Sequence, residues 1–394
     1  MENKNGTRLG AFLFVETSFF YLRIRYRREV KNMVKISLCM IVRDEEMVLE
    51  RCLESVANIV DEIVVVDTGS VDKTKDVAKK FTDQIYDYVW CDDFSAARNF
   101  AFSKGNCEYL MWMDADDVFP ASEKRKFFDM KENLEKQPCD MVMMIYDAAF
   151  DAEGKSSLSY YRERLIRNCP QARWEGRVHE VIVPFGEVRQ VDIHFEHRKE
   201  KKEYSERNLN IYEKMISEGQ TLDAREQFYY GRELFYHRNY EKATEVFKVF
   251  LQEPTAWLEN KLEAVRFLSY SLHTLGYIEE AFDALLQGLK LAPPTGEICC
   301  DIGKYFYNRT EWENAIFWYE NALHAEKRTE KGAFVLEECY GYLPCIQLCV
   351  CYDRIGDAER AEMYNEMAGV WKPNDEAVMK NREYFLKKKK AVSL

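Results

Sequence analysis

Short apolar runs alternate with amphipathic segments over the first half of the chain. Four apolar runs have the continuous character of strands that are buried on both faces: 36–42, 62–67, 84–90 and 109–113. Three segments between them carry apolar residues at helical spacing: 45–60, 70–81 and 95–105. Ser70 or Asp72 is expected to cap the second of these helices. The alternation predicts an α/β domain with a mostly parallel sheet, in which ligands bind at the carboxyl ends of the strands.

The pattern changes after Glu200, where paired amphipathic helices replace the strand-like runs. Four stretches resemble one another because each carries an alanine after a bulky or turn residue: 239–254, 276–293, 311–323 and 356–373. These alanines (Ala243, Ala281, Ala315 and Ala361) are spaced 38, 34 and 46 residues apart. A period of about 34 residues is that of tetratricopeptide repeats, and the other two spacings fit that period with insertions. We therefore expect an α/β domain over 33–200 and an all-α helical repeat domain over 201–394.

Repeats of this kind build a concave scaffold that usually binds a protein or peptide. The small alanines let two helices approach closely, while aromatic residues such as Phe247 and Tyr319 fill the layer between repeats. Tyr229, Tyr236 and Tyr270 are candidates for the concave surface, because tyrosine suits a surface that is half apolar and half wet. The alternative is a helical cap that only stabilises the first domain.

Residues 1–32 are expected to form a poorly ordered extension that adds little to the fold. The run 11–22 is apolar but is interrupted by Glu16, and the basic stretch 23–31 follows it directly. This run is too short for a transmembrane helix, which needs about 20 apolar residues. A helix lying on a membrane surface is the alternative.

Composition narrows the classes of function. A formal net charge of −12 argues against general nucleic-acid binding, which needs a basic face. Twelve cysteines without a CxxC pair, in a chain without a convincing signal peptide, predict reduced thiols in a cytoplasmic protein. Cys345, Cys349 and Cys351 lie in an apolar helical pattern, where we expect small buried residues rather than a metal site.

Acidic residues follow three of the predicted strands. Asp44 comes after the first strand, Asp67 ends the second, and Asp114 and Asp116 follow the fourth. Clustered carboxylates repel one another unless a cation joins them, so a divalent cation that also contacts a phosphate-bearing ligand is expected at this edge. Asp117 could support the metal ligands, but it is interpreted as the cap of the next helix. The chain has no GxGxxG or GxxxxGK[ST] motif for nicotinamide or P-loop chemistry.

Four ordered motifs carry a resemblance to a known family. "ISLCMIVRDEE", "IVVVDTGSVDKT", "DFSAARNFA" and "MWMDADD" resemble a family 2 glycosyltransferase of the GT-A fold over roughly 35–200. With its helical repeats, the chain is similar in layout to the sublancin-type peptide S-glycosyltransferases. The resemblance implies a metal-dependent, inverting glycosyltransferase that uses a nucleotide-sugar, expected to be a UDP-sugar. The implied acceptor is a peptide or protein Ser, Thr or Cys that the repeats recruit.

Two alternatives stay open. The enzyme could extend a cell-surface saccharide, or the chain could be a non-catalytic repeat scaffold attached to a silent transferase domain. A homodimer also remains open.

The same resemblance implies a binding site for the nucleotide-sugar. Asp67 would accept a hydrogen bond from the uracil ring N–H. Its other members would be the first-strand exit, the phosphate-side arginine and the first acid of the Asp-x-Asp pair: Val42, Arg43, Asp44, Arg98 and Asp114. Arg43 could stack on the base in place of the usual aromatic residue. An ion pair of Arg98 with Asp92 or Asp93 is the plainer alternative.

The metal and the catalytic base are implied in the same way. Asp114 and Asp116 would contact Mg²⁺ or Mn²⁺, and His197 would complete the metal site, with His194 and His179 as rivals. Glu180 would take the proton of the acceptor. Asp116 and Glu180 are therefore the expected catalytic residues.

Overall fold

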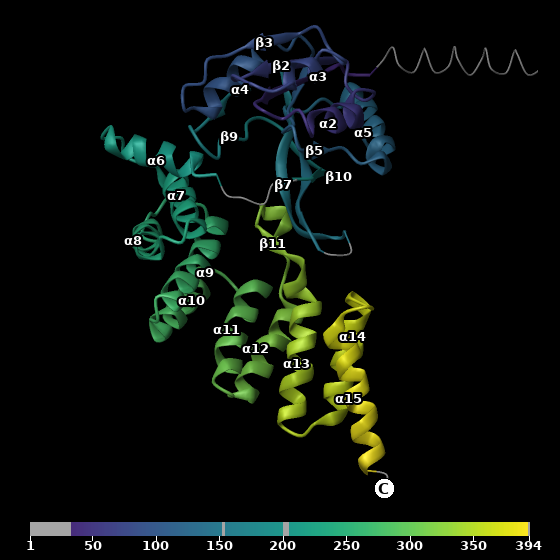
Figure 1. Ribbon diagram of the computed structural model, residues 1–394, viewed down its shortest axis with the longest axis vertical. Coiled ribbons are helices and arrows are strands. Elements are labelled where there is room, and N and C mark those ends of the chain that lie inside the picture. Colours follow the sequence, from purple (N-terminus) through teal and green to yellow (C-terminus); the bar gives the residue numbers. More distant parts are fainter. Residues whose placement is uncertain (1–32, 152–153, 200–204, 393–394) are drawn as a thin grey trace, which may run out of the picture.

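The computed structural model describes residues 33–151, 154–199 and 205–392. The predicted extension over 1–32 lies outside the described residues. A sheet with flanking helices forms one end of the molecule, and helices alone form the other (Figure 1). Both parts of the predicted fold class are confirmed.

Within the residues that the structure describes, the main sheet has nine strands. Eight follow the order β3-β2-β1-β4-β7-β6-β10-β5, and β11 pairs with β7. Their bounds are β1 (Ile36–Val42), β2 (Glu62–Asp67), β3 (Ile85–Asp87), β4 (Tyr109–Met111), β5 (Asp117–Val118), β6 (Met141–Phe150), β7 (Ser156–Arg167), β10 (Val188–His197) and β11 (Val335–Leu336). The first four strands are parallel to one another, as predicted, whereas β7 runs antiparallel to β4 and β6. The strands after residue 140 had no counterpart in the sequence analysis.

Two apolar layers hold this sheet. Alternate residues of β1 point to opposite faces. Leu38 and Met40 pack into one core cluster, and Cys39 packs into a second cluster on the other face. The helices of this domain are α2 (Leu49–Val56), α3 (Thr74–Ala78), α4 (Phe94–Phe102) and α5 (Lys124–Lys136). A small separate hairpin is formed by β8 (Trp174–Glu175) and β9 (Val181–Ile182).

The predicted cap of α3 was wrong. The helix begins after Lys73, which makes no side-chain cap. Ser70 instead contacts the neighbouring loop, since its Oγ accepts a hydrogen bond from the backbone nitrogen of Asp44 at 3.0 Å. Asp72 accepts from the backbone nitrogens of Glu46 and Thr74. These polar side chains therefore connect two loops at the carboxyl edge of the sheet, which shortens the helix.

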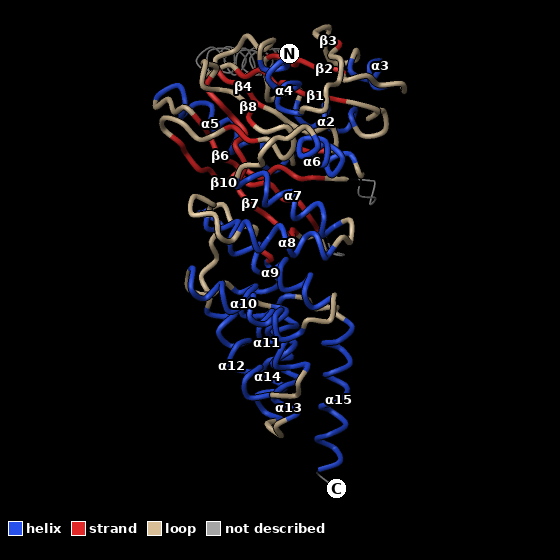
Figure 2. Tube along the Cα trace, turned by 90° about the vertical axis from the view of Figure 1, so that its left-hand side faces the viewer, coloured by secondary structure: helices blue, strands red, loops and turns tan. Residues whose placement is uncertain are grey.

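The second half of the chain is a stack of antiparallel helices (Figure 2). They are α6 (Arg207–Ser217), α7 (Ala224–Tyr236), α8 (Tyr240–Phe250), α9 (Leu258–Thr274), α10 (Ile278–Leu291), α11 (Gly296–Asn308), α12 (Trp312–His324), α13 (Tyr342–Arg354), α14 (Ala358–Trp371) and α15 (Glu376–Val392). The four repeat alanines are buried, as are Phe247 and Tyr319, so the predicted packing of small residues against aromatic ones is confirmed. Cys345, Cys349 and Cys351 are buried free thiols in the helical core.

An insertion between α12 and α13 explains the longest repeat spacing. It contains the short helices η3 (Thr329–Lys331) and η4 (Glu337–Tyr340), with β11 between them. Val335 and Leu336 pair with Ser159 and Leu158 of β7. The insertion thus attaches the repeats to the sheet through backbone hydrogen bonds.

Close packing between α7 and α8 generates a stability prediction. A Cβ atom on Gly231 would lie 2.6 Å from Cε1 of Phe247, whose side chain is completely buried. We expect Gly231→Ala to lower the free energy of unfolding by about 1–3 kcal/mol, measured by urea denaturation, because the ring must shift in a packed core.

Gly288→Ala in α10 is the matched control. There the nearest atom is the flexible end of Ile298, at 3.0 Å, and the higher helix propensity of alanine opposes the crowding. If both variants lost the same free energy of unfolding, the ring of Phe247 would be able to shift without cost.

Candidate functional site

Only one of the two carboxylate oxygens of Asp67 has hydrogen-bond partners among the described residues. It ends β2, it is 1% exposed, and its Oδ1 accepts hydrogen bonds from the backbone nitrogens of Gly69 and Ser70 at 2.9 Å each. Gly69 has a φ of 107°, which a side chain would strain, so the glycine permits this tight turn. The buried Oδ2 has no hydrogen-bond partner among the described residues. A buried acceptor without a partner is costly, so this oxygen is suited to an N–H group of a ligand.

The exit of β1 lies beside this turn. The backbone oxygen of Val42 accepts from the backbone nitrogen of Thr68 at 2.9 Å. Asp44 has a φ of 54°, and its carboxylate accepts from the backbone nitrogen of Val71 at 2.7 Å. The Arg43 side chain is 49% exposed and only 3.9 Å from Asp44, so it has room to reorient. The structure therefore brings the three predicted β1 residues to the edge that Asp67 occupies.

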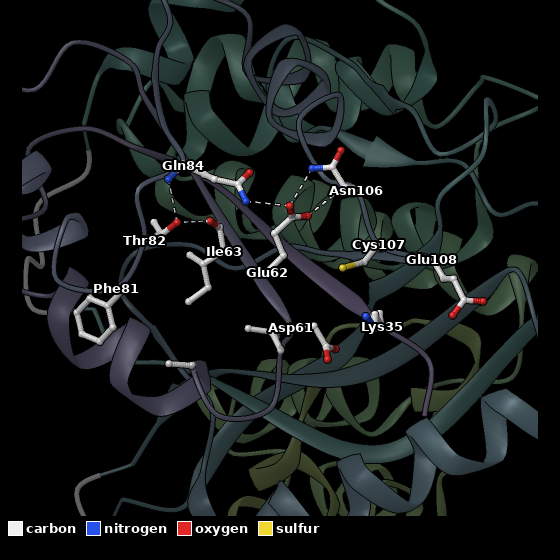
Figure 3. Close-up of a pocket in the computed structure, with 12 residues that line it drawn as sticks. Lys35, Asp61, Glu62, Ile63, Phe81, Thr82, Gln84, Asn106, Cys107 and Glu108 are labelled. Atoms are coloured by element: carbon white, nitrogen blue, oxygen red, sulfur yellow. Dashed lines mark hydrogen bonds between the residues drawn. The ribbon is translucent and has the colours of Figure 1, made fainter. Parts of the chain in front are cut away.

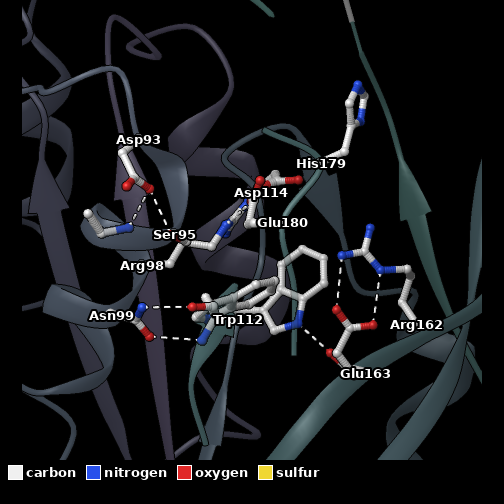
Figure 4. Close-up of polar contacts among 12 residues, drawn as sticks. Asp93, Ser95, Arg98, Asn99, Trp112, Asp114, Arg162, Glu163, His179 and Glu180 are labelled. Carbon is white, nitrogen blue, oxygen red and sulfur yellow. Dashed lines mark hydrogen bonds and ion pairs between the residues drawn. The ribbon is translucent and has the colours of Figure 1, made fainter. Parts of the chain in front are cut away.

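Arg98 links two acidic residues at the same edge (Figure 4). Its Nη2 donates to Asp114 at 2.7 Å, and its Nε donates to Glu180. The guanidinium carbon lies 4.9 Å from the ring centres of both Trp112 and Trp174, so two indole rings enclose the charge. Burial opposes the charge of Asp114, but Arg98 outweighs it and holds the pKa of this carboxyl at about 2.

The alternative partners proposed for Arg98 are engaged elsewhere. Asp92 pairs with Lys214 at 2.6 Å, and Asp93 caps α4 by accepting from the backbone nitrogen of Ala96. Arg98 therefore belongs to the site and not to a surface ion pair.

Asp116, Asp117 and His197 form the group that could hold a metal ion in the described part of the chain. Their ligand atoms lie within 4.8 Å of one another. His197 Nδ1 is 3.4 Å from a carboxylate oxygen of each acid. Burial opposes charge on the imidazole, but the hydrogen bonds with Asp116 and Asp117 outweigh it and raise its pKa to about 10. A divalent cation at this place would compete with that proton.

The interpretation of Asp117 as a helix cap was wrong. Asp117 is completely buried in β5, and its Oδ2 lies 3.1 Å from Nη1 of the equally buried Arg164. Its Oδ1 accepts from the hydroxyl of Tyr146 at 2.8 Å. The backbone nitrogen of Asp114 also donates to Asp117, at 3.1 Å. Asp117 therefore fixes the loop that presents Asp114 and Asp116.

The two rival histidines lie elsewhere. His194 is hydrogen-bonded to Asp147 at 2.8 Å and lies near Asp192. The ring of His179 points away from Arg98 and Asp114 in Figure 4, and it bonds to Glu233 of α7 at 2.8 Å. Of the three histidines, only His197 lies with Asp116.

A pocket lies at the opposite ends of the strands, where β1, β2 and β4 begin (Figure 3). It does not resemble a catalytic site. Its central acid, Glu62, accepts hydrogen bonds from Ser37, Gln84 and both nitrogens of Asn106. Desolvation opposes the charge, yet these donors lower the pKa of Glu62 to about 2. The carboxylate is thus occupied by internal partners, and the carboxyl edge remains the candidate site.

The sequence analysis missed Arg164, Tyr146 and Trp174. Arg164 lies in a strand that was not assigned, and no motif around it marks a buried arginine. This strand carries three other charged residues (Arg162, Glu163 and Arg167), so no local signal in the sequence singled out Arg164.

A protein-family model matches most of the sheet domain. Residues 37–194 match the model of glycosyl transferase family 2, so this part of the chain is a family 2 glycosyltransferase domain, as the motifs indicated. An all-helical, tetratricopeptide-like region follows it.

Two relatives share parts of this organisation. A TPR repeat-containing protein of Synechococcus elongatus is 36% identical over 154 residues, which are 38% of this chain and 36% of the relative. The SPbeta prophage-derived glycosyltransferase SunS of Bacillus subtilis is 27% identical over 225 residues, which are 54% of this chain and 52% of the relative. The chain thus matches about a third to a half of the length of these relatives. The crystal structure of S. aureus TarS aligns with 64% of this chain and 54% of its own, at 11% identity and a TM-score of 0.33.

No helix in the described part of the chain combines the length and apolar character needed to cross a membrane.

The donors around Glu62 generate a prediction about acid stability. The folded-state pKa of about 2 lies below the ordinary 4.5, so the carboxylate stabilises the fold above pH 4.5 and loses this effect as the pH falls toward 2. Glu62→Gln should therefore make the free energy of unfolding less dependent on pH in this window, measured by urea denaturation. Glu108→Gln, an exposed acid of the same pocket, is the control and should keep the slope of the parent. An unchanged slope in Glu62→Gln would contradict the assignment.

Proposed function

We propose that the protein is a metal-dependent, inverting glycosyltransferase that uses a UDP-sugar and modifies a peptide or protein. One observation carries the proposal: a buried, unpartnered oxygen of Asp67 lies at the same sheet edge as the Asp116–Asp117–His197 group. The first feature suits the ring N–H of uracil, and the second suits a hard divalent cation. A donor with a base at one end and a diphosphate at the other fits this pairing.

Different residues would bind the two ends of the donor, the base and the diphosphate. Asp67 holds the base, with Val42, Arg43 and Asp44 beside it. Asp116 and His197 would hold Mg²⁺ or Mn²⁺, and Asp114, fixed by Arg98, would meet the ribose or the metal. The cation would act as a Lewis acid that neutralises the charge of the leaving diphosphate. Oxygen and imidazole ligands suit Mn²⁺, and the carboxylates suit Mg²⁺.

Glu180 is the proposed base. Inversion requires the acceptor atom to attack the sugar carbon from the face opposite the diphosphate while it loses its proton. Glu180 is 9% exposed, and Arg98 joins it to Asp114 next to the expected donor. One arginine thus fixes the relative placement of the proposed base and of the first acid of the Asp-x-Asp pair.

The repeats are proposed to recruit the acceptor. Of the predicted concave tyrosines, Tyr236 and Tyr270 are half-buried. The prediction for Tyr229 was wrong, since it is buried and its ring stacks on His179 at 4.3 Å. Half-buried tyrosines on the repeats would suit an extended peptide better than a short saccharide.

Base recognition generates one test. Asp67→Asn keeps an oxygen for Gly69 and Ser70 but offers an NH₂ group where uracil also has a donor. We expect UDP with Mn²⁺ to bind about tenfold more weakly, measured by calorimetry, because two donors then face each other. CDP, whose ring nitrogen is an acceptor, should lose less affinity and is the internal control. Equal affinity for UDP in variant and parent would make Asp67 only a turn residue.

The metal site generates another. Asp116→Asn should reduce turnover about a hundredfold or more, with the melting temperature nearly unchanged, because an acid in an open site contributes little to stability. Release of UDP from UDP-glucose, UDP-galactose and UDP-N-acetylglucosamine is the assay, with peptide and saccharide acceptors in separate arms. Asp129→Asn, an exposed acid on α5, is the control and should keep parental activity. Full turnover in Asp116→Asn, or turnover unaffected by a chelator, would refute the metal-dependent reaction.

A further inference from the structure

The loop that carries Glu180 connects the sheet domain to the helical repeats. Residues 176–180 join β8 to β9, and the loop bends through two left-handed residues, Gly176 at φ 92° and His179 at φ 52°. Glycine tolerates this conformation at no cost, but histidine does not. The surroundings must therefore hold His179 in place, and those surroundings belong to the repeats.

Val178 anchors the loop in the repeat domain. Its side chain is 3% exposed and packs in the apolar cluster of α6 and α7, with Ile211 and Met215, and not in either core cluster of the sheet. The hydroxyl of Tyr212 donates to the backbone oxygen of Val178 at 3.4 Å. The loop thus inserts an apolar side chain into the first helical pair.

His179 makes the polar half of the same attachment. Its Nε2 lies 2.8 Å from Oε1 of Glu233, and its ring stacks on Tyr229 at an interplanar angle of 15°. Asn208 donates to the same oxygen of Glu233 at 3.2 Å. Arg225 donates to the backbone oxygen of His179 at 3.1 Å and 3.3 Å. Three side chains of α7 therefore fix the residue that precedes Glu180, and Asn208 of α6 holds one of them in place.

The residue after His179 is Glu180, which faces the candidate site at the carboxyl ends of the strands. Its carboxylate accepts a hydrogen bond from Nε of Arg98, and Nη2 of the same arginine donates to Asp114. The buried Nη1 of Arg98 has no partner among the described residues, so this guanidinium is not held by a full set of hydrogen bonds. The position of Glu180 thus depends on how firmly its own loop is held.

We infer that helices α6 and α7 complete the proposed active site. Glu233 of α7 and His179 of the β8–β9 loop are positioning residues that hold Glu180 against Arg98. This inference rests on the proposed function for the role of Glu180, but the attachment itself does not. The repeats then do more than recruit an acceptor, because the contacts of α7 also hold the five-residue loop that carries the proposed base.

The experiment uses the full chain with three variants. Glu233→Ala removes the partner of His179, whereas Glu233→Gln keeps an oxygen that can accept from His179 and Asn208. Glu213→Gln is the matched control: this acid on α6 binds Lys242 and Tyr230 inside the repeat and does not touch the loop. Thermal unfolding verifies that each variant is folded. If Glu233→Ala does not fold, His179→Gly replaces it, since glycine relieves the left-handed backbone while removing the side chain that binds Glu233.

Two measurements are made on each variant. Hydrogen exchange of the peptide covering 174–182 should accelerate about tenfold or more in Glu233→Ala and stay parental in Glu233→Gln and Glu213→Gln. The kcat for UDP release from the UDP-sugar that the parent uses should fall about ten- to hundredfold in Glu233→Ala, with the Kd for UDP and Mn²⁺ within about twofold. In a Glu180→Gln background, Glu233→Ala should cost no further activity, because the residue that it positions is already gone.

The outcomes separate the two claims. Parental exchange in a folded Glu233→Ala variant overturns the attachment. Accelerated exchange with a parental kcat overturns the positioning role. Accelerated exchange in a protein that releases UDP from none of the tested UDP-sugars supports the attachment and counts against the proposed function. Full additivity of Glu233→Ala with Glu180→Gln would show that the repeat acts on something other than Glu180.

Discussion

The candidate site depends on the buried guanidinium of Arg98, which must be paired with carboxylates. A charge enclosed by Trp112 and Trp174 must be neutralised, and the two available carboxylates come from different parts of the chain. Asp114 follows β4, and Glu180 ends the β8–β9 loop. If either acid moved away, Arg98 would lose one of its two ionic partners, although its Nη1 already has no partner among the described residues. The ion pairs therefore fix the distance between the donor side and the acceptor side of the proposed site.

A second buried arginine, Arg164, also helps to fix the loop that carries Asp114 and Asp116. Arg164 on β7 pairs with Asp117, and Asp117 in turn holds the backbone of Asp114 and lies beside His197. Replacing this buried pair by apolar residues could preserve stability, as buried ion pairs often contribute little net energy. Its value is geometric, because it sets the direction in which the acidic loop leaves the sheet. A buried arginine thus helps to place the acidic loop twice, once from α4 and once from β7.

Periodicity and motif spacing predicted the parallel half of the sheet and the repeats, because both depend on local patterns of apolar residues. The exact bounds of β1 and β2 followed from continuous apolar runs, and the buried repeat alanines followed from their spacing. The tertiary partners could not be read in this way. Asp117 has the local signature of a helix cap, and only the buried Arg164 on a distant strand makes it an anchor. Tyr229 likewise resembles a surface aromatic until His179 stacks on it.

Among the contacts between the repeats and the sheet domain, two lie far apart in the sequence. The β8–β9 loop inserts Val178 into the α6–α7 pair, and the insertion between α12 and α13 adds β11 to the edge of β7. A single contact would leave a hinge, whereas two separated contacts resist rotation of one domain against the other. The insertion that lengthens the repeat spacing therefore has a mechanical consequence at the catalytic edge. With the second contact in place, α7 stays against the loop of Glu180, so the geometry around Arg98 and the orientation of the repeats are set by the same interface.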